Sequence, residues 1–483
     1  MSKNKLAGII PACVIVVSAV IVVIAFHPWR PPISSPVYSL SVGISPSGAG
    51  SVFLSPSGGE YDADAQVTVT ATPAVGYRFV NWTGDVGTVA DVNSASAVIW
   101  MNDDYSITAN FALEVAEITD WYDLDAVRDD LGGSYLLMND LDSTVAGYVE
   151  LASKTANDRK GWEPIGTSSD GFTGSFNGQG HEIRDLFINR PGQGYVGLFA
   201  RVSWIHPSEN GGLIENIGVV QADVTGGAVV GVLVGHNGGI VNNSYSICSV
   251  AGDGWFVGGL VGYDDGGLVS NSYCSGNVTG TYHVGGLVGR IEGKRTVREG
   301  NVRNCYSASS VTGDTRVGGL VGSTYSDVGV SNSYSTGSAT GRRWIGGLVA
   351  ENYGGNVSNS YSTGNVTGRD YSGYIGGLVA LNLWGNISNC YSTGTVNGKA
   401  PVGGLVGDNS GGTVNNSFWD TETSGQATSD GGIGKTTNEL KNITTFTGAG
   451  WNIVAVASTD IGNPPYIWNI VDGQTYPFLS WQP

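Results

Sequence analysis

A pentapeptide of the form Gly-Gly-Leu-Val-Gly recurs through the second half of the chain and constrains its fold most strongly. The copies, some of which end in Ala, begin at Gly258, Gly285, Gly318, Gly346, Gly376 and Gly403. They are 27 to 33 residues apart. This period is typical of solenoids, in which each repeat buries its apolar edge only against its neighbours. The sequence therefore predicts a stacked repeat architecture and says much less about activity.

A second motif, of the form Val-Ser-Asn-Ser-Tyr-Ser, follows the pentapeptides. An apolar residue two positions before its Asn, such as Val357 or Ile387, gives the period of two that a β-strand needs, so we expect Val, Asn and Tyr to share one face. In-register stacking would bring equivalent side chains to about 4.8 Å, close enough for amides to hydrogen-bond along a column. We expect a structural ladder formed by Asn216, Asn243, Asn271, Asn304, Asn332, Asn359, Asn389 and Asn416.

These patterns predict a mainly β protein with a parallel β-helix or β-solenoid of about seven to nine rungs, a small β module before it and one transmembrane helix. The 76 glycines among 483 residues suit a chain dense in turns, and 41% hydrophobic residues suffice for a continuous core. The expected parts are an anchor (1–36), the β module (37–112), a helical cap with irregular first rungs (113–195), the solenoid (196–420) and a closing cap (421–483).

The first residues resemble a membrane anchor. Lys3 and Lys5 precede an uncharged apolar run from Leu6 to Phe26, and about 20 such residues can span a bilayer as a helix. We expect a single-pass anchor at the cell membrane with the bulk of the chain outside. The alternatives are a cleaved signal peptide, which would leave the protein secreted, and a lipoprotein cleavage site, which Ile10-Pro-Ala-Cys13 resembles.

The charge of the chain narrows its partners. A net charge of −18 argues against nucleic acid, because phosphate binding needs a basic face. The partners that we expect are the membrane, through the N-terminal helix, and surface glycans or proteins, with self-association as a further alternative. The four cysteines of the repeat region are expected to be free thiols, since their positions in the rungs place them beyond disulfide reach.

The segment from Val37 to Ala112 is a separate unit of alternating strands and Gly-Pro turns. Its Ala-Thr-Pro-x-x-Gly-Tyr-x-Phe-x-x-Trp run, from Ala71 to Trp82, resembles the bacterial extracellular repeat related to the internalin B-repeat. That resemblance implies a small β-rich spacer module. We expect the aromatic residues of the run, Tyr77, Phe79 and Trp82, to form its core.

Short non-repeating segments flank the repeats. Trp121, Leu124, Val127 and Leu131 have helical spacing behind Asp120, a plausible N-cap, and predict a short helix. Such a helix would cover the open end of the solenoid, which is otherwise a template for aggregation. The aromatic C-terminal segment that begins with Phe418-Trp-Asp-Thr-Glu-Thr would close the other end.

Together the pentapeptides, their entry sequence and the Phe-Trp-Asp-Thr-Glu-Thr tail resemble the GLUG-repeat proteins of bacterial and archaeal surfaces, over roughly residues 118–483. The resemblance implies a surface protein, in some cases adhesin-like, and the related repeats also lie beside the protease domains of secreted peptidases. It is specific for architecture and weak for activity, because function depends on a site.

One column of residues is the best candidate for ligand binding. Two positions before each pentapeptide, the chain carries Phe256, His283, Trp344 and Tyr374 among others, and the next residue is always Val or Ile. If that Val or Ile points inward, strand alternation turns the column outward. A row of exposed aromatic rings could stack on sugar rings or on a protein ligand.

Catalytic signatures are weak, and we expect no enzyme. Gly432-Ile-Gly-Lys-Thr-Thr lacks the first glycine of a P-loop. The alternative is a polysaccharide-active β-helix enzyme, a lyase or glycoside hydrolase, with Glu351 and Asp408 two rungs apart as its acids. No cofactor is expected, although Asp264 and Asp265 leave a weak option for calcium.

Overall fold

The computed structural model describes residues 35–74, 76–203, 211–293, 302–369, 373–399, 401–459 and 463–482. Backbone contacts divide the chain into two compact units. The first unit contains the described residues up to Thr72 together with Phe79–Asn110, and the second contains Pro73–Arg78 and the described residues from Phe111 onward.

The first unit is a small module of two β-sheets. The order of the four-stranded sheet is β3-β1-β7-β5 and that of the three-stranded sheet is β2-β4-β6. Trp82 is 1% exposed and packs beside Phe79, with ring centroids 5.4 Å apart, so this part of the aromatic run contributes to the core as predicted. The strands are β1 (Val37–Ser45), β2 (Gly50–Ser55), β3 (Glu60–Asp62), β4 (Ala65–Pro73), β5 (Tyr77–Gly84), β6 (Ser96–Met101) and β7 (Tyr105–Leu113).

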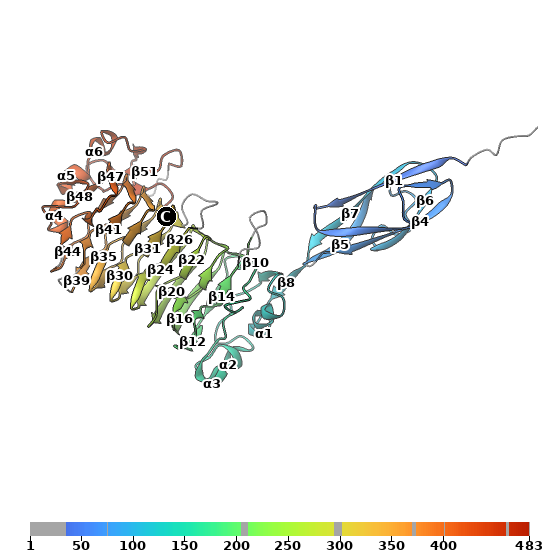
Figure 1. Ribbon diagram of the computed structural model, residues 1–483, viewed down its shortest axis with the longest axis horizontal. Coiled ribbons are helices and arrows are strands. Elements are labelled where there is room, and N and C mark those ends of the chain that lie inside the picture. Colours follow the sequence, from blue (N-terminus) through green and yellow to red (C-terminus); the bar gives the residue numbers. More distant parts are fainter. Residues whose placement is uncertain are drawn as a thin grey trace, which may run out of the picture. The chain divides into compact units, whose positions relative to one another are not determined.

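The second unit is a parallel β-solenoid, whose rungs follow one another in colour order in Figure 1. Successive coils pass through four stacked sheets, which we number 1 to 4 in the order in which a coil visits them. Sheets 3 and 4 each have eight strands within the described residues. The mainly β class and the parallel solenoid are therefore confirmed, with a repeat number inside the predicted range.

Sheets 1 and 2 form half of each coil. The strands of sheet 1 are β8 (Val115–Ile118), β9 (Ser134–Leu137), β10 (Ser175–Asn177), β15 (Leu213–Glu215), β19 (Ile240–Asn242), β23 (Leu268–Ser270), β27 (Val302–Arg303), β32 (Gly329–Ser331), β37 (Asn356–Ser358), β42 (Asn386–Ser388) and β47 (Thr413–Asn415). Those of sheet 2 are β11 (Glu182–Arg184), β12 (Phe187–Arg190), β16 (Gly218–Gly226), β20 (Tyr245–Gly252), β24 (Tyr273–Thr279), β28 (Tyr306–Ser307), β29 (Ser310–Thr312), β33 (Tyr334–Ser335), β34 (Ala339–Gly341), β38 (Tyr361–Ser362), β39 (Val366–Gly368), β43 (Tyr391–Ser392), β44 (Val396–Asn397), β48 (Phe418–Asp420) and β49 (Ile433–Lys435).

Sheets 3 and 4 flank the pentapeptide turn. The strands of sheet 3 are β13 (Tyr195–Val196), β17 (Val229–Gly231), β21 (Phe256–Gly258), β25 (Tyr282–Gly285), β30 (Thr315–Gly318), β35 (Arg343–Gly346), β40 (Ile375–Gly376) and β45 (Val402–Gly403). Those of sheet 4 are β14 (Phe199–Val202), β18 (Val234–Asn237), β22 (Val261–Asp265), β26 (Val288–Glu292), β31 (Val321–Tyr325), β36 (Val349–Tyr353), β41 (Val379–Leu383) and β46 (Val406–Asp408).

The repeated Asn forms the corner between sheets 1 and 2. It has a positive φ in all eight predicted copies, for example 48° at Asn359, and Asn is one of the few residues that tolerate this conformation. Amide hydrogen bonds link some neighbours, such as Asn243 to Asn216 at 2.7 Å and Asn304 to Asn271 at 3.1 Å.

The corner corrects the expectation that Val, Asn and Tyr share one face. Val357 and the small residue after each Tyr, such as Ser362 or Cys274, are completely buried in the core. Strand alternation therefore turns the Tyr rings onto the outer side of sheet 2. Six rings stack there with centroids 4.7–5.0 Å apart and planes within 5° of parallel: Tyr245, Tyr273, Tyr306, Tyr334, Tyr361 and Tyr391.

The predicted N-terminal helix is present as α1 (Trp121–Ala126), followed by the 3-10 turn η1 (Val127–Asp129). The Asp120 side chain accepts hydrogen bonds from the amides of Tyr122 and Asp123, both at 2.9 Å, as an N-cap. Trp121, Leu124 and Val127 are buried against the first rungs. Two further short helices, α2 (Tyr148–Leu151) and α3 (Ala156–Arg159), lie at the same end of the solenoid (Figure 1).

The C-terminal segment packs on the outer side of sheet 2. It covers the stacked rings of Tyr334, Tyr361 and Tyr391 with Trp451, Trp468 and other aromatic residues. Its elements are α4 (Thr421–Ser424), α5 (Thr437–Leu440), α6 (Ile443–Thr447), β50 (Ile453–Ala455), β51 (Trp468–Ile470) and β52 (Phe478–Leu479). The four cysteines of the repeats are buried free thiols, as predicted.

The predicted fold class is wrong in one respect. None of the helices in the described part of the chain is long and apolar enough to cross a membrane. The run from Leu6 to Phe26, on which the transmembrane prediction depended, lies outside the described residues.

Candidate functional site

Sheets 3 and 4 meet so closely that the outward side chains of both form one continuous seam. The close approach requires glycine: a Cβ on Gly258 would lie 1.9 Å from the Val261 carbonyl oxygen, and one on Gly262 would lie 2.7 Å from that of Gly235. Sheet 3 contributes Tyr195, Val229, Phe256, His283, Arg316, Trp344 and Tyr374 to the seam. Sheet 4 contributes Arg201, His236, Tyr263, Arg290, Ser323, Glu351, Leu381 and Asp408.

Aromatic rings fill the first half of the seam. The ring of Phe256 lies 4.9 Å from that of Tyr263 and 5.2 Å from that of His283, centroid to centroid. The Arg290 guanidinium lies 5.3 Å from the Phe256 ring and 4.0 Å from the ring of Tyr325. Phe256 is therefore surrounded on several sides by side chains of its own solenoid.

An ion pair fills the second half. Arg316 Nε lies 2.5 Å from Glu351 Oε2, and the Tyr325 hydroxyl donates to the same oxygen at 3.0 Å. The Arg316 guanidinium also lies 4.2 Å from the centre of the Trp344 ring. Glu351 is only 4% exposed, so its charge is balanced inside the protein.

His283 is buried within the seam by its neighbours. It is 5% exposed, and its Nδ1 lies 2.6 Å from Ser323 Oγ. Burial, together with the charges of Arg316 and Arg290, lowers the pKa of His283 to about 3. The imidazole is therefore neutral at physiological pH.

The four predicted ligand residues thus differ in how far they are exposed to solvent. His283 is buried, and Phe256, Trp344 and Tyr374 are half-buried, so the expected row of freely exposed rings does not form. The reason is local: His283 and Trp344 have positive φ values of 43° and 54°, which interrupt the strand alternation that the prediction assumed.

The freely exposed rings of the repeats lie beside these positions and were missed. Trp255 is 60% and Tyr282 39% exposed, and their rings stack at 5.5 Å with an interplanar angle of 25°. Each precedes a predicted residue, Phe256 or His283, by one position, which is the signal that the sequence offered. Trp384 is 62% exposed and contacts Tyr353 edge to face at the corner after sheet 4.

The two acids of the enzyme alternative do not converge. Glu351 pairs with Arg316, whereas Asp408 accepts a hydrogen bond from Ser410 at 2.5 Å. Leu381 stands between them in register, paired with Glu351 on one side and Asp408 on the other.

The calcium candidate lies at an inner corner of the solenoid. Asp264 is fully buried and accepts a hydrogen bond of 2.6 Å from the Asn237 amide. Equivalent positions in later rungs form a second ladder that the sequence analysis missed, in which Asn352 donates to Asn382 at 2.8 Å and Asn382 donates to Asn409 at 2.7 Å. Nowhere in the described ranges do three His, Cys, Asp or Glu side chains gather as metal ligands.

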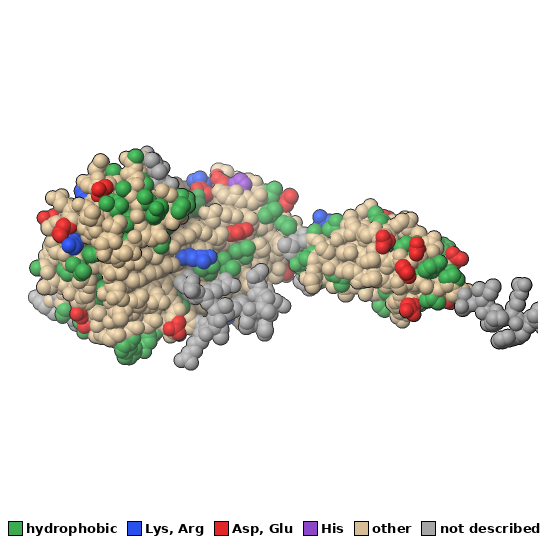
Figure 2. Space-filling model, turned by 90° about the horizontal axis from the view of Figure 1, so that it is seen from above, with side chains coloured by type: hydrophobic (Ala, Val, Ile, Leu, Met, Phe, Trp, Pro, Cys, Tyr) green, Lys and Arg blue, Asp and Glu red, His purple; other side chains and the backbone are tan. Residues whose placement is uncertain are grey.

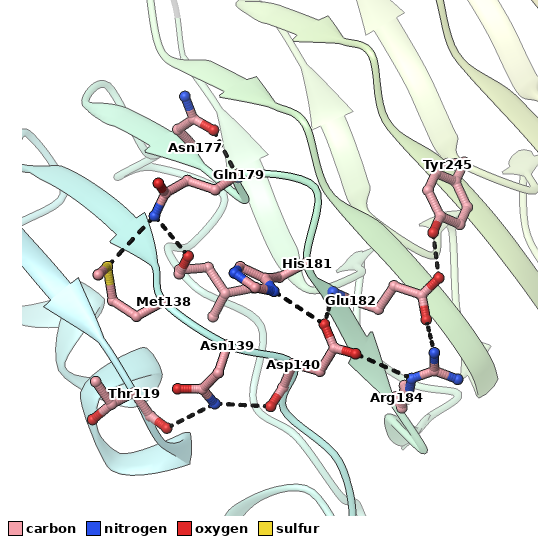
Figure 3. A network of polar contacts seen from close by, with 11 residues as sticks. Thr119, Met138, Asn139, Asp140, Asn177, Gln179, His181, Glu182, Arg184 and Tyr245 are labelled. Carbon is pink, nitrogen blue, oxygen red and sulfur yellow. Dashed lines mark hydrogen bonds and ion pairs between the residues drawn. The ribbon is translucent and has the colours of Figure 1, made fainter.

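A charged network joins the irregular first rungs (Figure 3). Asp140 lies 3.3 Å from His181 and 3.8 Å from Arg184, while Glu182 pairs with Arg184 and accepts a hydrogen bond from the Tyr245 hydroxyl. Burial, followed by that hydrogen bond, raises the pKa of Tyr245. Both carboxylates are thus engaged by cations or phenol, and the network links the first turns of the solenoid to one another.

The seam ends in a cavity at its first rungs. The cavity has a volume of about 500 Å³ and is open to solvent. One wall is the segment that follows α3, and the other is formed by β13, β17 and the residues just before them. Its lining comprises Glu163, Pro164, Gly166, Thr167, Ser168, Gln193, Gly194, Tyr195, Ala200, Ala228 and Val229.

Charged side chains are sparse on the face of the molecule shown in Figure 2. On the face shown in Figure 2, most of the repeat surface consists of backbone and uncharged polar side chains, and the basic residues lie apart from one another. This distribution agrees with the net charge of −18 and offers no phosphate-binding patch on that face.

Fold and seam together define a parallel β-solenoid repeat protein preceded by a small β-rich module. Comparison with protein families gives both parts a name. Residues 40–115 match the divergent InlB B-repeat domain, and residues 280–312, 345–367 and 371–397 match the GLUG motif. The chain therefore carries GLUG repeats and a module that matches the InlB B-repeat, as the sequence motifs predicted.

Two curated proteins are similar over part of the chain. Halomucin of Haloquadratum walsbyi is 34% identical over 125 residues, which are 25% of this chain and 1% of halomucin. A protein of Evansella cellulosilytica, provisionally named a Gly-rich membrane protein, is 36% identical over 118 residues, which are 23% of this chain and 12% of that protein. The chain thus matches only a small part of either relative.

Two solved structures align with much of the chain at low similarity. A crystal structure from Bacteroides ovatus, provisionally named an immunoglobulin A1 protease, aligns with 77% of this chain and 93% of its own at 20% identity and a TM-score of 0.44. A chain named IgA1 protease aligns with 82% of this chain and 30% of its own at 14% identity and a TM-score of 0.33.

Proposed function

We propose that this chain is a cell-surface repeat protein whose solenoid binds saccharides without cleaving them. The observation that carries the proposal is the set of exposed rings on the rungs, Trp255, Tyr282 and Trp384. Aromatic rings with a free face or edge suit the apolar faces of sugars, and Trp255 and Tyr282 form a stacked, exposed pair. The names of the two partial relatives, halomucin and a Gly-rich membrane protein, support a location at the surface.

A glycan array probed with the purified full chain tests the proposal. We expect binding that weakens in Trp255→Ala or Trp384→Ala, whereas Trp344→Ala, at a half-buried ring that packs on Arg316, serves as a control for general damage. Binding of proteins alone would contradict the saccharide proposal. Self-association in sedimentation experiments, with no ligand at all, would indicate a purely structural protein.

The polysaccharide-active enzyme remains the second candidate, since repeat solenoids can carry acids on neighbouring rungs. Here the Arg316–Glu351 pair favours a structural carboxylate over a catalytic one. Product analysis on every array hit decides between the two. Product release that is lost in Glu351→Gln would replace the binding proposal by an enzymatic one.

A further inference from the structure

We propose that the cavity at the first rungs of the seam is a saccharide subsite, which holds one end of the ligand while Trp255 supports the next sugar. This inference rests on the proposed function and adds to it the location of the site and one bound ligand per chain. The volume of the cavity, about 500 Å³, lies within the range of small-molecule sites, which is roughly 300–1,000 Å³.

The cavity exists because one row of the solenoid begins with small residues. In register, the row reads Gly194, Ala228, Trp255 and Tyr282 on successive rungs, extending the pairing of Tyr195 with Val229 and of Val229 with Phe256. Tyr282 covers one face of the Trp255 indole. The preceding position of the row is Ala228, which lines the cavity, and Trp255 is itself 60% exposed one rung further along.

The opposite wall is held in place by the backbone. Ile165 donates to the Leu198 carbonyl oxygen at 2.9 Å and accepts from the Ala200 amide at 2.8 Å, so this segment continues sheet 4 by one rung. The guanidinium of Arg128 also donates to the Pro164 carbonyl oxygen at 2.9 Å. A cavity with fixed walls binds without a large ordering cost.

The lining matches a sugar better than a peptide side chain. The Tyr195 ring offers a stacking surface, and Glu163, Thr167, Ser168 and Gln193 offer acceptors and donors for hydroxyl groups. Its aliphatic members, Pro164, Ala200, Ala228 and Val229, are short, so the site lacks the deep apolar pocket that a Leu or Phe anchor would fill. Stacking combined with many hydroxyl partners is the chemistry of a pyranose ring.

Gly194 provides a clean test. A Cβ on Gly194 would meet no atom within 4 Å, and the same holds for Gly192, which does not line the cavity. Gly194→Trp should therefore fill the cavity without disturbing the fold, and Gly192→Trp is the matched control. Binding of cello-, xylo-, chito- and galacturono-hexaose to the full chain would be measured by calorimetry.

We expect at least one hexaose to bind the unaltered chain and Gly192→Trp equally well, and Gly194→Trp about tenfold or more weakly. Trp255→Ala should weaken binding roughly three- to tenfold, the value of an aromatic contact. Equal affinities of Gly194→Trp and the control would overturn the subsite and leave the proposed function intact. If no hexaose binds the unaltered chain, the subsite is also overturned, and the glycan array decides separately whether the proposed function stands.

Discussion

The hydroxyl of Tyr476 donates a hydrogen bond of 2.6 Å to Asp420 Oδ2 and thereby ties the C-terminal segment to the last strand of the repeats. Asp420 also accepts hydrogen bonds from the Thr437 hydroxyl and from the amides of Glu422 and Thr423. Burial acts to raise the pKa of Asp420, but these four hydrogen bonds outweigh it and hold the pKa below its usual value. The Asp420 carboxylate is thus buried and charged, and it accepts four hydrogen bonds from the protein.

Loss of the phenol hydroxyl should loosen the C-terminal cap. A hydrogen bond to a charged group contributes about 1.5–3 kcal/mol, so we expect Tyr476→Phe to lower the free energy of unfolding by roughly that amount. Urea unfolding followed by the fluorescence of the cap tryptophans measures it. Tyr466→Phe, at an exposed ring, is the control. Equal unfolding midpoints for the two variants would show that the hydrogen bond is dispensable.

Acid should destabilise the solenoid through His283. Its pKa is about 3 in the folded chain and about 6.5 when unfolded, so below pH 6.5 the unfolded state binds the extra proton and stability falls until about pH 3. The groups that face the ring are Arg290, Arg316, Ser323 and Phe256. The loss between pH 7 and pH 4 is roughly 3 kcal/mol at most.

The variant His283→Asn removes the titrating group while keeping a residue that accepts positive φ. Its unfolding free energy at neutral pH should be lower than that of the unaltered chain, because the contact with Phe256 is lost. The difference between pH 7 and pH 4 should, however, be smaller in the variant. If both proteins lose the same stability between these pH values, another group is responsible.

The corner Asn residues should stabilise the fold more by tolerating a positive φ than by the hydrogen bonds of their side-chain amides. An ordinary L-residue in the left-handed region costs about 1–2 kcal/mol, whereas glycine adopts it freely. Asn359→Gly and Asn359→Ala both remove the weak 3.4 Å hydrogen bond from Asn389, so the difference between the two variants isolates the backbone term. We expect Ala to be the less stable by about 1 kcal/mol in urea unfolding. Asn277→Ala, on an exposed strand position, should change little.

Repetition explains why so much of the fold could be predicted. A fixed period and an alternating pattern identify the solenoid, the number of rungs and the inward Val residues, because each coil sees only its neighbours. The N-terminal helix was likewise predictable, since Asp120 and the spacing of Trp121, Leu124 and Val127 are local signals.

The candidate site was less predictable because it depends on where the alternation fails. Positive φ at Asn359 reverses the face of the Tyr that follows it, and positive φ at His283 and Trp344 changes which residue of the row is exposed. A sequence pattern does not reveal these positions, since positive φ is uncommon for residues other than glycine and is not marked by any motif here. The cavity escaped prediction for another reason: its second wall comes from the segment Glu163–Ser168, whose sequence does not follow the repeat motifs.

The pair of Arg316 and Glu351 should behave as a coupled unit. Removing one partner of a buried ion pair leaves the other charge uncompensated, which costs about 3–5 kcal/mol, whereas removing both costs much less. We therefore expect the double variant Arg316→Ala/Glu351→Ala to lose less unfolding free energy than the sum of the losses in the two single variants. In a double-mutant cycle from urea unfolding, the coupling energy should exceed about 1 kcal/mol. Additive single and double changes would mean that solvent already screens the pair, and would reopen Glu351 as a carboxylate available for chemistry.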